Sequence, residues 1–137
     1  MIYVLDASVI LKWFLQEPDS ADALRYRDYH MAGTANVACP DLALYEIGNT
    51  LCLKRGVPEE ALLKALGDLF RLALDILSPT EALLQQAARV ASSRPITFYD
   101  AVYVALAQEL EATFVSADLR LCHQIRGLLP IELLSPP

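Results

Sequence analysis

Four acidic residues, spread widely along the chain, stand where side chains with chemical roles are often found. Asp6 follows one short apolar run and Asp118 follows another. Asp100 begins an almost wholly apolar segment, and Glu46 lies within an apolar pattern of helical spacing. A charge in such surroundings is unfavourable unless it is paired or bound to a metal. These four carboxylates are therefore the first candidates for a functional site.

Each acid also has a simpler interpretation when it is taken alone. Asp100 suits the first turn of a helix, where the helix dipole favours a negative charge. Asp118 could cap the helix that follows it, and Asp6 could occupy a strand-to-helix turn. Glu46 could be a solvated residue on a helix face. None of the four is specific by itself.

Together, the four acids predict a site for a divalent cation. No group of basic residues is placed in the sequence to pair with them. Unpaired carboxylates that lie close together repel each other and tend to take up protons, and a bound cation removes that repulsion. A ligand set made of carboxylates alone favours Mg²⁺ or Mn²⁺. Such an ion binds a phosphodiester, activates water and stabilises the leaving oxygen, which favours a metal-dependent nuclease.

The elements that must position these acids follow from apolar runs and turn signals. Strand-type runs occur at 2–5, 37–39, 72–77, 113–115 and 129–134. Helical patterns occur at 9–15, 20–31, 40–55, 58–70, 78–93, 100–110 and 119–126, with Ser8 as a cap for the first and Pro40 in the first turn of the third. Uniformly apolar strands that alternate with helices predict a parallel sheet covered on both faces.

This arrangement can bring the four acids together. In open parallel sheets, ligands bind beyond the carboxyl ends of the strands, near the point where strand order reverses. Asp6 follows the first predicted strand, and Asp118 follows the fourth. Asp100 starts the helix before that fourth strand, and Glu46 lies on the helix after the second. We expect all four to face one edge of the sheet, within a few ångströms of each other.

Composition indicates one ordinary globular domain over residues 1–137, without a linker or an internal repeat. An apolar content of 55% and a charged content of 20% exclude a disordered chain. The formal net charge of -6 offers nucleic acid little attraction, although the four acids contribute to it and a bound cation would offset them. The apolar N-terminus lacks a basic region, and Asp6 and Lys12 interrupt it, so it predicts neither a signal peptide nor a membrane span.

The cysteines and histidines add no metal ligands to this picture. Cys39, Cys52 and Cys122 show no C-x-x-C spacing and lie in apolar stretches, so we expect buried free thiols, which suit a reducing cytoplasm. His30 and His123 stand far apart and are expected at the surface or at helix ends.

Motifs for other kinds of site are absent from the sequence. There is no G-x-x-x-x-G-K-[ST], no G-x-G-x-x-G and no G-x-S-x-G. A receiver domain would need an acidic pair after the first strand and an Asp at the end of the third. This chain has a lone Asp6, and Leu77, Ser78 and Pro79 at the third position, so that alternative ranks last.

Four blocks of sequence resemble the pattern of the PIN-domain family. They are VLDAS at 4–8, YEIGN at 45–49, YDAVYVALA at 99–107 and SAD at 116–118. Their order and the length of the chain especially resemble the VapC-type toxins of prokaryotic toxin–antitoxin pairs. The resemblance covers essentially the whole chain, and the block at 99–107 is its most specific part.

The resemblance implies a three-layer α/β/α sandwich with a parallel central sheet. It also implies a cytoplasmic Mg²⁺- or Mn²⁺-dependent endoribonuclease, a hydrolase that acts as the toxin of a VapBC-type toxin–antitoxin system. The catalytic metal site would then be formed by Asp6, Glu46, Asp100 and Asp118. Flanking polar residues would orient these carboxylates; they are Ser8, Asn49 and Ser116, the last at a position where the family often carries Thr.

The same resemblance implies an RNA substrate, a small antitoxin protein that covers the active site, and a homodimer without membrane attachment. The exposed part of Lys12, Trp13 and Phe14 is a candidate contact, with a core role as the alternative for Trp13. Lys54 and Arg55 could touch RNA phosphates or could simply be solvated. A catalytically inactive PIN-like binding or scaffold domain is the alternative function, although the presence of all four acids argues against it.

Overall fold

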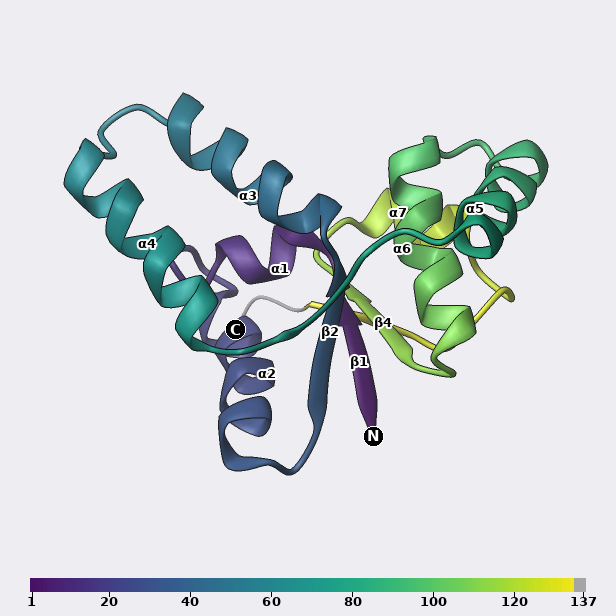
Figure 1. The fold of residues 1–137 in the computed structure, drawn as a ribbon, viewed down its shortest axis with the longest axis horizontal. Coiled ribbons are helices and arrows are strands. Elements are labelled where there is room, and N and C mark those ends of the chain that lie inside the picture. The colour runs from purple at the N-terminus through teal and green to yellow at the C-terminus, as the bar shows by residue number, and fades with distance from the viewer. Residues whose placement is uncertain (135–137) are drawn as a thin grey trace.

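The structure, a computed structural model, describes residues 1–134 (Figure 1). Within them the strands form one parallel sheet in the order β3-β2-β1-β4-β5. The strands are β1 (Ile2–Leu5), β2 (Asn36–Pro40), β3 (Asp75–Leu77), β4 (Thr113–Ser116) and β5 (Ile131–Leu133). The helices are α1 (Ala7–Leu11), α2 (Ser20–Ala32), α3 (Leu42–Leu53), α4 (Glu59–Arg71), α5 (Glu81–Ser93), α6 (Phe98–Glu109) and α7 (Leu119–Gln124). The predicted alternation of strands and helices is confirmed.

Strand β1 lies at the centre of the sheet and pairs with β2 on one side and β4 on the other. Tyr3 lies opposite Val37 of β2 and opposite Thr113 of β4. The chain builds β2 and β3 outward from β1, then returns to add β4 and β5 on the other side. Strand order therefore reverses between β1 and β4, which is where an open parallel sheet forms its ligand-binding crevice.

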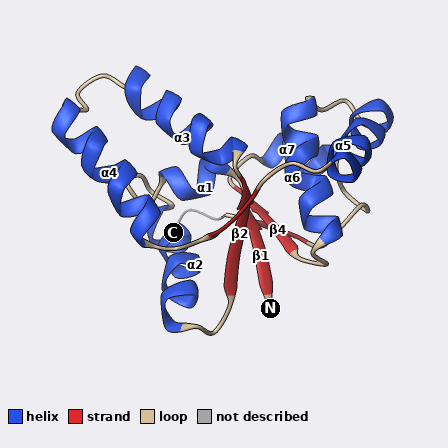
Figure 2. Ribbon diagram, in the orientation of Figure 1, coloured by secondary structure: helices blue, strands red, loops and turns tan. Residues whose placement is uncertain are grey.

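Helices cover both faces of the sheet, as the three-layer prediction required. Figure 2 shows α1 to α4 on one side of the strands and α5 to α7 on the other. Helix α6 is buried along residues 101–107, because it packs against the sheet on one side and against α5 on the other. That double packing explains why its sequence is apolar all round instead of carrying one apolar stripe.

Two helix starts differ from the prediction, and both changes involve the acids. Asp6, and not Ser8, caps α1, since its side chain accepts a hydrogen bond from the Ser8 N–H. Thr97 caps α6 and accepts a hydrogen bond from the Asp100 N–H at 3.0 Å. Asp100 therefore lies within the first turn of α6 and does not begin it.

Two further differences concern the end of β2 and the start of β3. Pro40 ends β2 instead of opening α3, because it lies opposite Leu77 and the next N–H, that of Asp41, donates to the Leu77 carbonyl at 3.0 Å. The strand predicted at 72–77 begins only at Asp75, since α4 continues to Arg71 and a turn follows with Ala73 at φ 52°. Pairing with β3 sets the first boundary, and the turn after α4 sets the second.

His30 has a structural role that its sequence position did not reveal. It lies near the end of α2 and is half-buried, and its Nδ1 accepts a hydrogen bond from the Val37 N–H at 3.1 Å. Its Nε2 lies 3.1 Å from the Leu72 carbonyl oxygen. Since Nδ1 accepts, Nε2 is the protonated nitrogen and donates a hydrogen bond to the carbonyl. The imidazole thereby joins α2 to β2 and to the turn after α4. His123, in contrast, is exposed on α7.

The cysteine prediction is correct for two residues and wrong for one. Cys39 and Cys122 are buried free thiols, whereas Cys52 is exposed on α3. Burial raises the pKa of the Cys39 thiol to about 12. None of the helices in residues 1–134 has the length and apolar character needed to cross a membrane.

The segment after α1 is held by internal contacts. The Trp13 Nε1–H donates to the Ala23 carbonyl at 2.8 Å, and the ring packs against the core. The Lys12 ammonium pairs with Glu17 and lies 2.9 Å from an Asp19 carboxylate oxygen. These contacts support the core alternative for Trp13.

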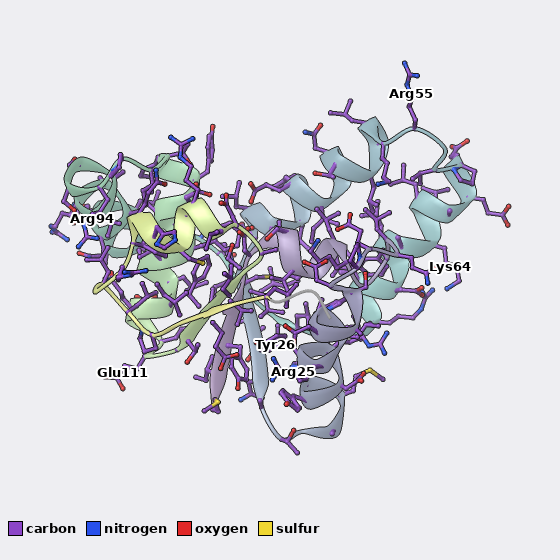
Figure 3. All side chains as sticks on the ribbon, turned by 180° about the vertical axis from the view of Figure 1, so that it is seen from behind. Arg25, Tyr26, Arg55, Lys64, Arg94 and Glu111 are labelled. Atoms are coloured by element: carbon purple, nitrogen blue, oxygen red, sulfur yellow. The ribbon has the colours of Figure 1, made fainter. Side chains whose placement is uncertain are left out.

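A second set of contacts joins α2 to the far edge of the sheet. The Tyr26 hydroxyl donates to the Glu132 carboxylate of β5. The Arg25 guanidinium lies over the Tyr26 ring at 4.9 Å from its centroid, and Figure 3 labels both residues beside the strands. Burial and the Glu132 carboxylate raise the pKa of Tyr26, so its hydroxyl stays protonated and donates at neutral pH.

Phe114 offers a test of the hydrophobic core between the sheet and α6. It is 0% exposed on β4, with its ring centroid 6.3 Å from that of Tyr103. We expect Phe114→Ala to lower the free energy of unfolding by about 3–5 kcal/mol, because it leaves a cavity between the sheet and α6. Urea denaturation measures this change. Phe70→Ala is the control, since Phe70 is 66% exposed on α4 and its loss should change stability by less than about 0.5 kcal/mol. Equal effects of the two substitutions would contradict the described core.

Candidate functional site

Two of the predicted acids meet where strand order reverses. Asp6 directly follows β1, and Asp118 lies two residues beyond the end of β4. The Ser116 hydroxyl donates a hydrogen bond to Asp6 Oδ2 at 2.8 Å. The Ser116 hydroxyl oxygen in turn accepts a hydrogen bond from the Asp118 N–H at 3.0 Å. One buried hydroxyl therefore joins the ends of the two strands and orients the Asp6 carboxylate.

Ser8 reinforces the same junction from the start of α1. Its N–H lies 3.5 Å from Asp6 Oδ1, and its hydroxyl oxygen accepts a hydrogen bond from the Ala117 N–H at 3.3 Å. The loop after β4 is thereby attached to the turn after β1. Ser8 and Ser116 thus contact opposite oxygens of one carboxylate.

Glu46 reaches the site from α3 and is held by a residue of α6. The Tyr103 hydroxyl donates to Glu46 Oε1 at 2.7 Å, and the Tyr103 ring is fully buried. Burial and the Glu46 carboxylate raise the pKa of Tyr103, so the hydroxyl remains a donor. Sequence reasoning missed this role for Tyr103. The available signal was its spacing of three residues from Asp100, which places both side chains on one face of α6.

Asn49 differs from the two serines in its surroundings. It lies three residues after Glu46, on the same side of α3, and it is exposed. No hydrogen bond between Asn49 and the four acids occurs in residues 1–134. Its expected orienting role stays a prediction.

The caps and the candidate site use different atoms of the same residues. Asp118 Oδ1 accepts a hydrogen bond from the Leu121 N–H at 3.1 Å, which caps α7 and leaves its second oxygen for another partner. Asp6 caps α1 while it also receives the Ser116 hydroxyl. The simpler structural roles are therefore compatible with a shared site.

The four acids share one electrostatic environment. Burial raises the pKa of Asp6, Glu46 and Asp100 above their usual values. The neighbouring charges add to this effect: Asp118 raises the pKa of Asp6, and Asp6 raises the pKa of Glu46 and Asp100. Hydrogen bonds from Ser116 and Ser8 partly offset the rise for Asp6.

No cation compensates these charges, and the acids do not close around a single point. None of the ion pairs in residues 1–134 includes any of the four. In the same residues, no three Asp, Glu, His or Cys side chains are grouped closely enough to hold a metal ion as they stand. The expected separation of a few ångströms stays a prediction.

Comparison with known proteins places this geometry in a family. The family model for the PIN domain matches residues 3–126. Ribonuclease VapC3 of Pyrobaculum aerophilum is 31% identical over 135 residues, which cover 94% of this chain and 98% of the relative.

Solved structures share the fold at lower identity. One is VapBC2 from Rickettsia felis bound to a DNA fragment from their promoter, with a TM-score of 0.74, 16% identity, and coverage of 98% of this chain and 100% of that chain. Another is Mycobacterium tuberculosis VapC20, described as a toxin that cleaves the sarcin–ricin loop, with a TM-score of 0.72, 18% identity and full coverage of both chains. With its parallel sheet, its reversal at β1 and β4, and a family match over most of its length, the chain belongs to the PIN-domain family.

Proposed function

We propose that this protein is a divalent-metal-dependent endoribonuclease and the toxin of a VapBC-type toxin–antitoxin system. The observation that carries the proposal is the set of four electrostatically coupled acids, without an ion pair in residues 1–134, where strand order reverses. The relative named as a ribonuclease, 31% identical over almost the whole chain, supports RNA as the substrate.

The donor set fits Mg²⁺ or Mn²⁺, because these ions prefer carboxylate oxygens and keep several waters. Asp6, Glu46, Asp100 and Asp118 would hold the ion. When bound, it would polarise a phosphodiester, lower the pKa of a water molecule and stabilise the leaving oxygen. The open spacing of the acids requires small side-chain movements toward the ion, which relief of their repulsion would favour.

The neighbouring polar groups position these ligands. Ser116 and Ser8 hold the Asp6 carboxylate through its two oxygens, and Tyr103 holds one oxygen of Glu46. Hydrogen bonds of this kind fix the orientation of a metal ligand and increase its affinity for the ion.

The remaining proposals concern assembly. We propose a single domain over residues 1–137 that acts in the cytoplasm and associates with a small antitoxin protein. The VapBC2 structure of the same fold and the acidic charge of this chain, which suits a basic partner segment, support that association. The expected homodimer stays a prediction.

Substitution of Asp6 tests the metal site. We expect Asp6→Asn to reduce Mg²⁺-dependent cleavage of RNA by at least about 100-fold, because it removes one charged ligand oxygen. Cleavage assays and calorimetric titration with Mn²⁺ measure the effect. Asp75→Asn is the matched control, since Asp75 is exposed on β3. Wild-type cleavage by Asp6→Asn would refute the assignment, and a wild-type protein without saturable Mn²⁺ binding would favour the inactive scaffold domain.

Ser116 tests the positioning of Asp6. We expect Ser116→Ala to lower Mn²⁺ affinity or activity by about 10- to 100-fold, because the carboxylate loses the donor that orients it. Ser116→Thr keeps a hydroxyl and should retain most of both. Circular dichroism checks that each variant is folded. If Ala and Thr behave alike, the hydroxyl has no positioning role.

The metal-free protein should show the repulsion directly. Burial and Asp6 raise the pKa of Asp100, so its contribution to stability is present below its usual pKa and is lost as pH rises through the raised value. We therefore expect Asp100→Asn to raise the melting temperature in EDTA at about pH 7, with a smaller difference at about pH 4. Differential scanning calorimetry measures both. Excess Mn²⁺ should stabilise the wild type more than the variant. A lower melting temperature for Asp100→Asn in EDTA at neutral pH would contradict the expected repulsion.

A further inference from the structure

Exposed aromatic residues stand next to two of the four acids. Tyr45 immediately precedes Glu46 on α3 and is 76% exposed. Tyr99 immediately precedes Asp100 on α6 and is 62% exposed, and Phe98 beside it is 42% exposed. Successive helical residues point about 100° apart, so each tyrosine lies on the solvent-exposed side of its helix, beside the face that carries the acid.

This placement is unusual within the chain. The sequence contains four Phe, six Tyr and one Trp. Within residues 1–134 the exposed members are Tyr45, Phe70, Phe98 and Tyr99, and the others are buried or half-buried. Three of these four therefore lie within two residues of an acid. Single exposed apolar residues are ordinary, but a group of them around one site indicates a binding surface.

The two tyrosines approach the site from opposite layers of the fold. Helix α3 lies on one side of the sheet and α6 lies on the other (Figure 1). The carboxylates of Glu46 and Asp100 are coupled to Asp6 between these helices. An occupant of the acidic site would therefore have an aromatic residue available on each flank.

Few cations adjoin the four acids along the chain. In the sequence, Arg120 is the only cationic residue within two positions of any of the four acids. Lys54 is the first cation after Glu46, eight residues on and roughly 12 Å along the helix direction. Arg55, at the tip of α3, points away from the rest of the protein (Figure 3). Besides the proposed metal ion, the sequence next to the acids therefore offers few cations for the phosphates, and uncharged groups would have to contribute to RNA binding.

We infer that Tyr45 and Tyr99 stack against unpaired bases of single-stranded RNA, one on either side of the phosphodiester bond that is cleaved at the four acids. This inference rests on the proposed nuclease function. Bases are uncharged and tolerate the acidic surroundings, and every base presents a face that can stack on an aromatic ring. Bases in a duplex are already stacked and paired, so the two platforms would select unpaired segments.

The test compares Tyr45→Ala and Tyr99→Ala with Tyr→Phe at each position. With a single-stranded oligoribonucleotide, we expect each Ala variant to raise KM by about fivefold to 100-fold and to leave kcat nearly unchanged. The Phe variants keep the ring and should behave as the wild type. Phe70→Ala, which removes an exposed ring on α4, is the matched control and should have no effect.

A second readout detects stacking without cleavage. A 2-aminopurine base placed in the oligoribonucleotide is quenched when it stacks, and it should be quenched by Asp6→Asn protein but not by the same protein carrying Tyr99→Ala. Binding that depends on stacking should also weaken only slightly with added salt. The wild type should cleave the same sequence poorly when it is held in a duplex.

The outcomes separate this inference from the proposed function. If the wild type cleaves RNA and the Ala variants retain its KM and its quenching, the inference is wrong and the nuclease assignment stands. If Phe variants lose as much as Ala variants, the hydroxyl and not the ring face is responsible, which also overturns it. If the wild type neither cleaves RNA nor binds Mn²⁺, the proposed function itself fails.

Discussion

The parallel pairing of β1 with β4 is the contact on which the rest of the site depends. Leu5 lies opposite Val115, and the Asp6 N–H continues the ladder by donating to the Val115 carbonyl at 3.0 Å. Asp6 and Ser116 therefore leave their strands side by side, and the Ser116 hydroxyl can join them. A register shift of one residue would turn Ser116 to the opposite face of the sheet and break this junction.

The fold gathers acids at this junction against their mutual repulsion. Hydroxyl donors, such as Ser116 for Asp6 and Tyr103 for Glu46, limit the unfavourable energy. Burial nevertheless raises the pKa of both acids. A site built in this way is less stable empty than filled, and an ion that binds only the folded chain would stabilise it by mass action.

Local signals predicted most of the elements, and pairing across the sheet caused one of the errors. The strand at 2–5 and the helices at 20–32 and 81–93 agree closely with the sequence, and Thr80 caps the last of them through its own side chain. Pro40 was misassigned to a helix, because its pairing with Leu77 keeps it in β2. Cys52 was expected to be buried, but it lies on an exposed face of α3 that periodicity alone did not distinguish.

The amino-acid sequence by itself determined the alternation of strands and helices, the parallel sheet, the four acids and the resemblance to PIN domains. Only the tertiary structure decided the strand order, the bond from Tyr103 to Glu46, the separation of the acids and the exposure of Tyr45 and Tyr99. The physical reason is the range of the interactions concerned. Periodicity, caps and turns depend on neighbours along the chain, whereas these contacts join residues that meet only after the sheet and its helices have packed.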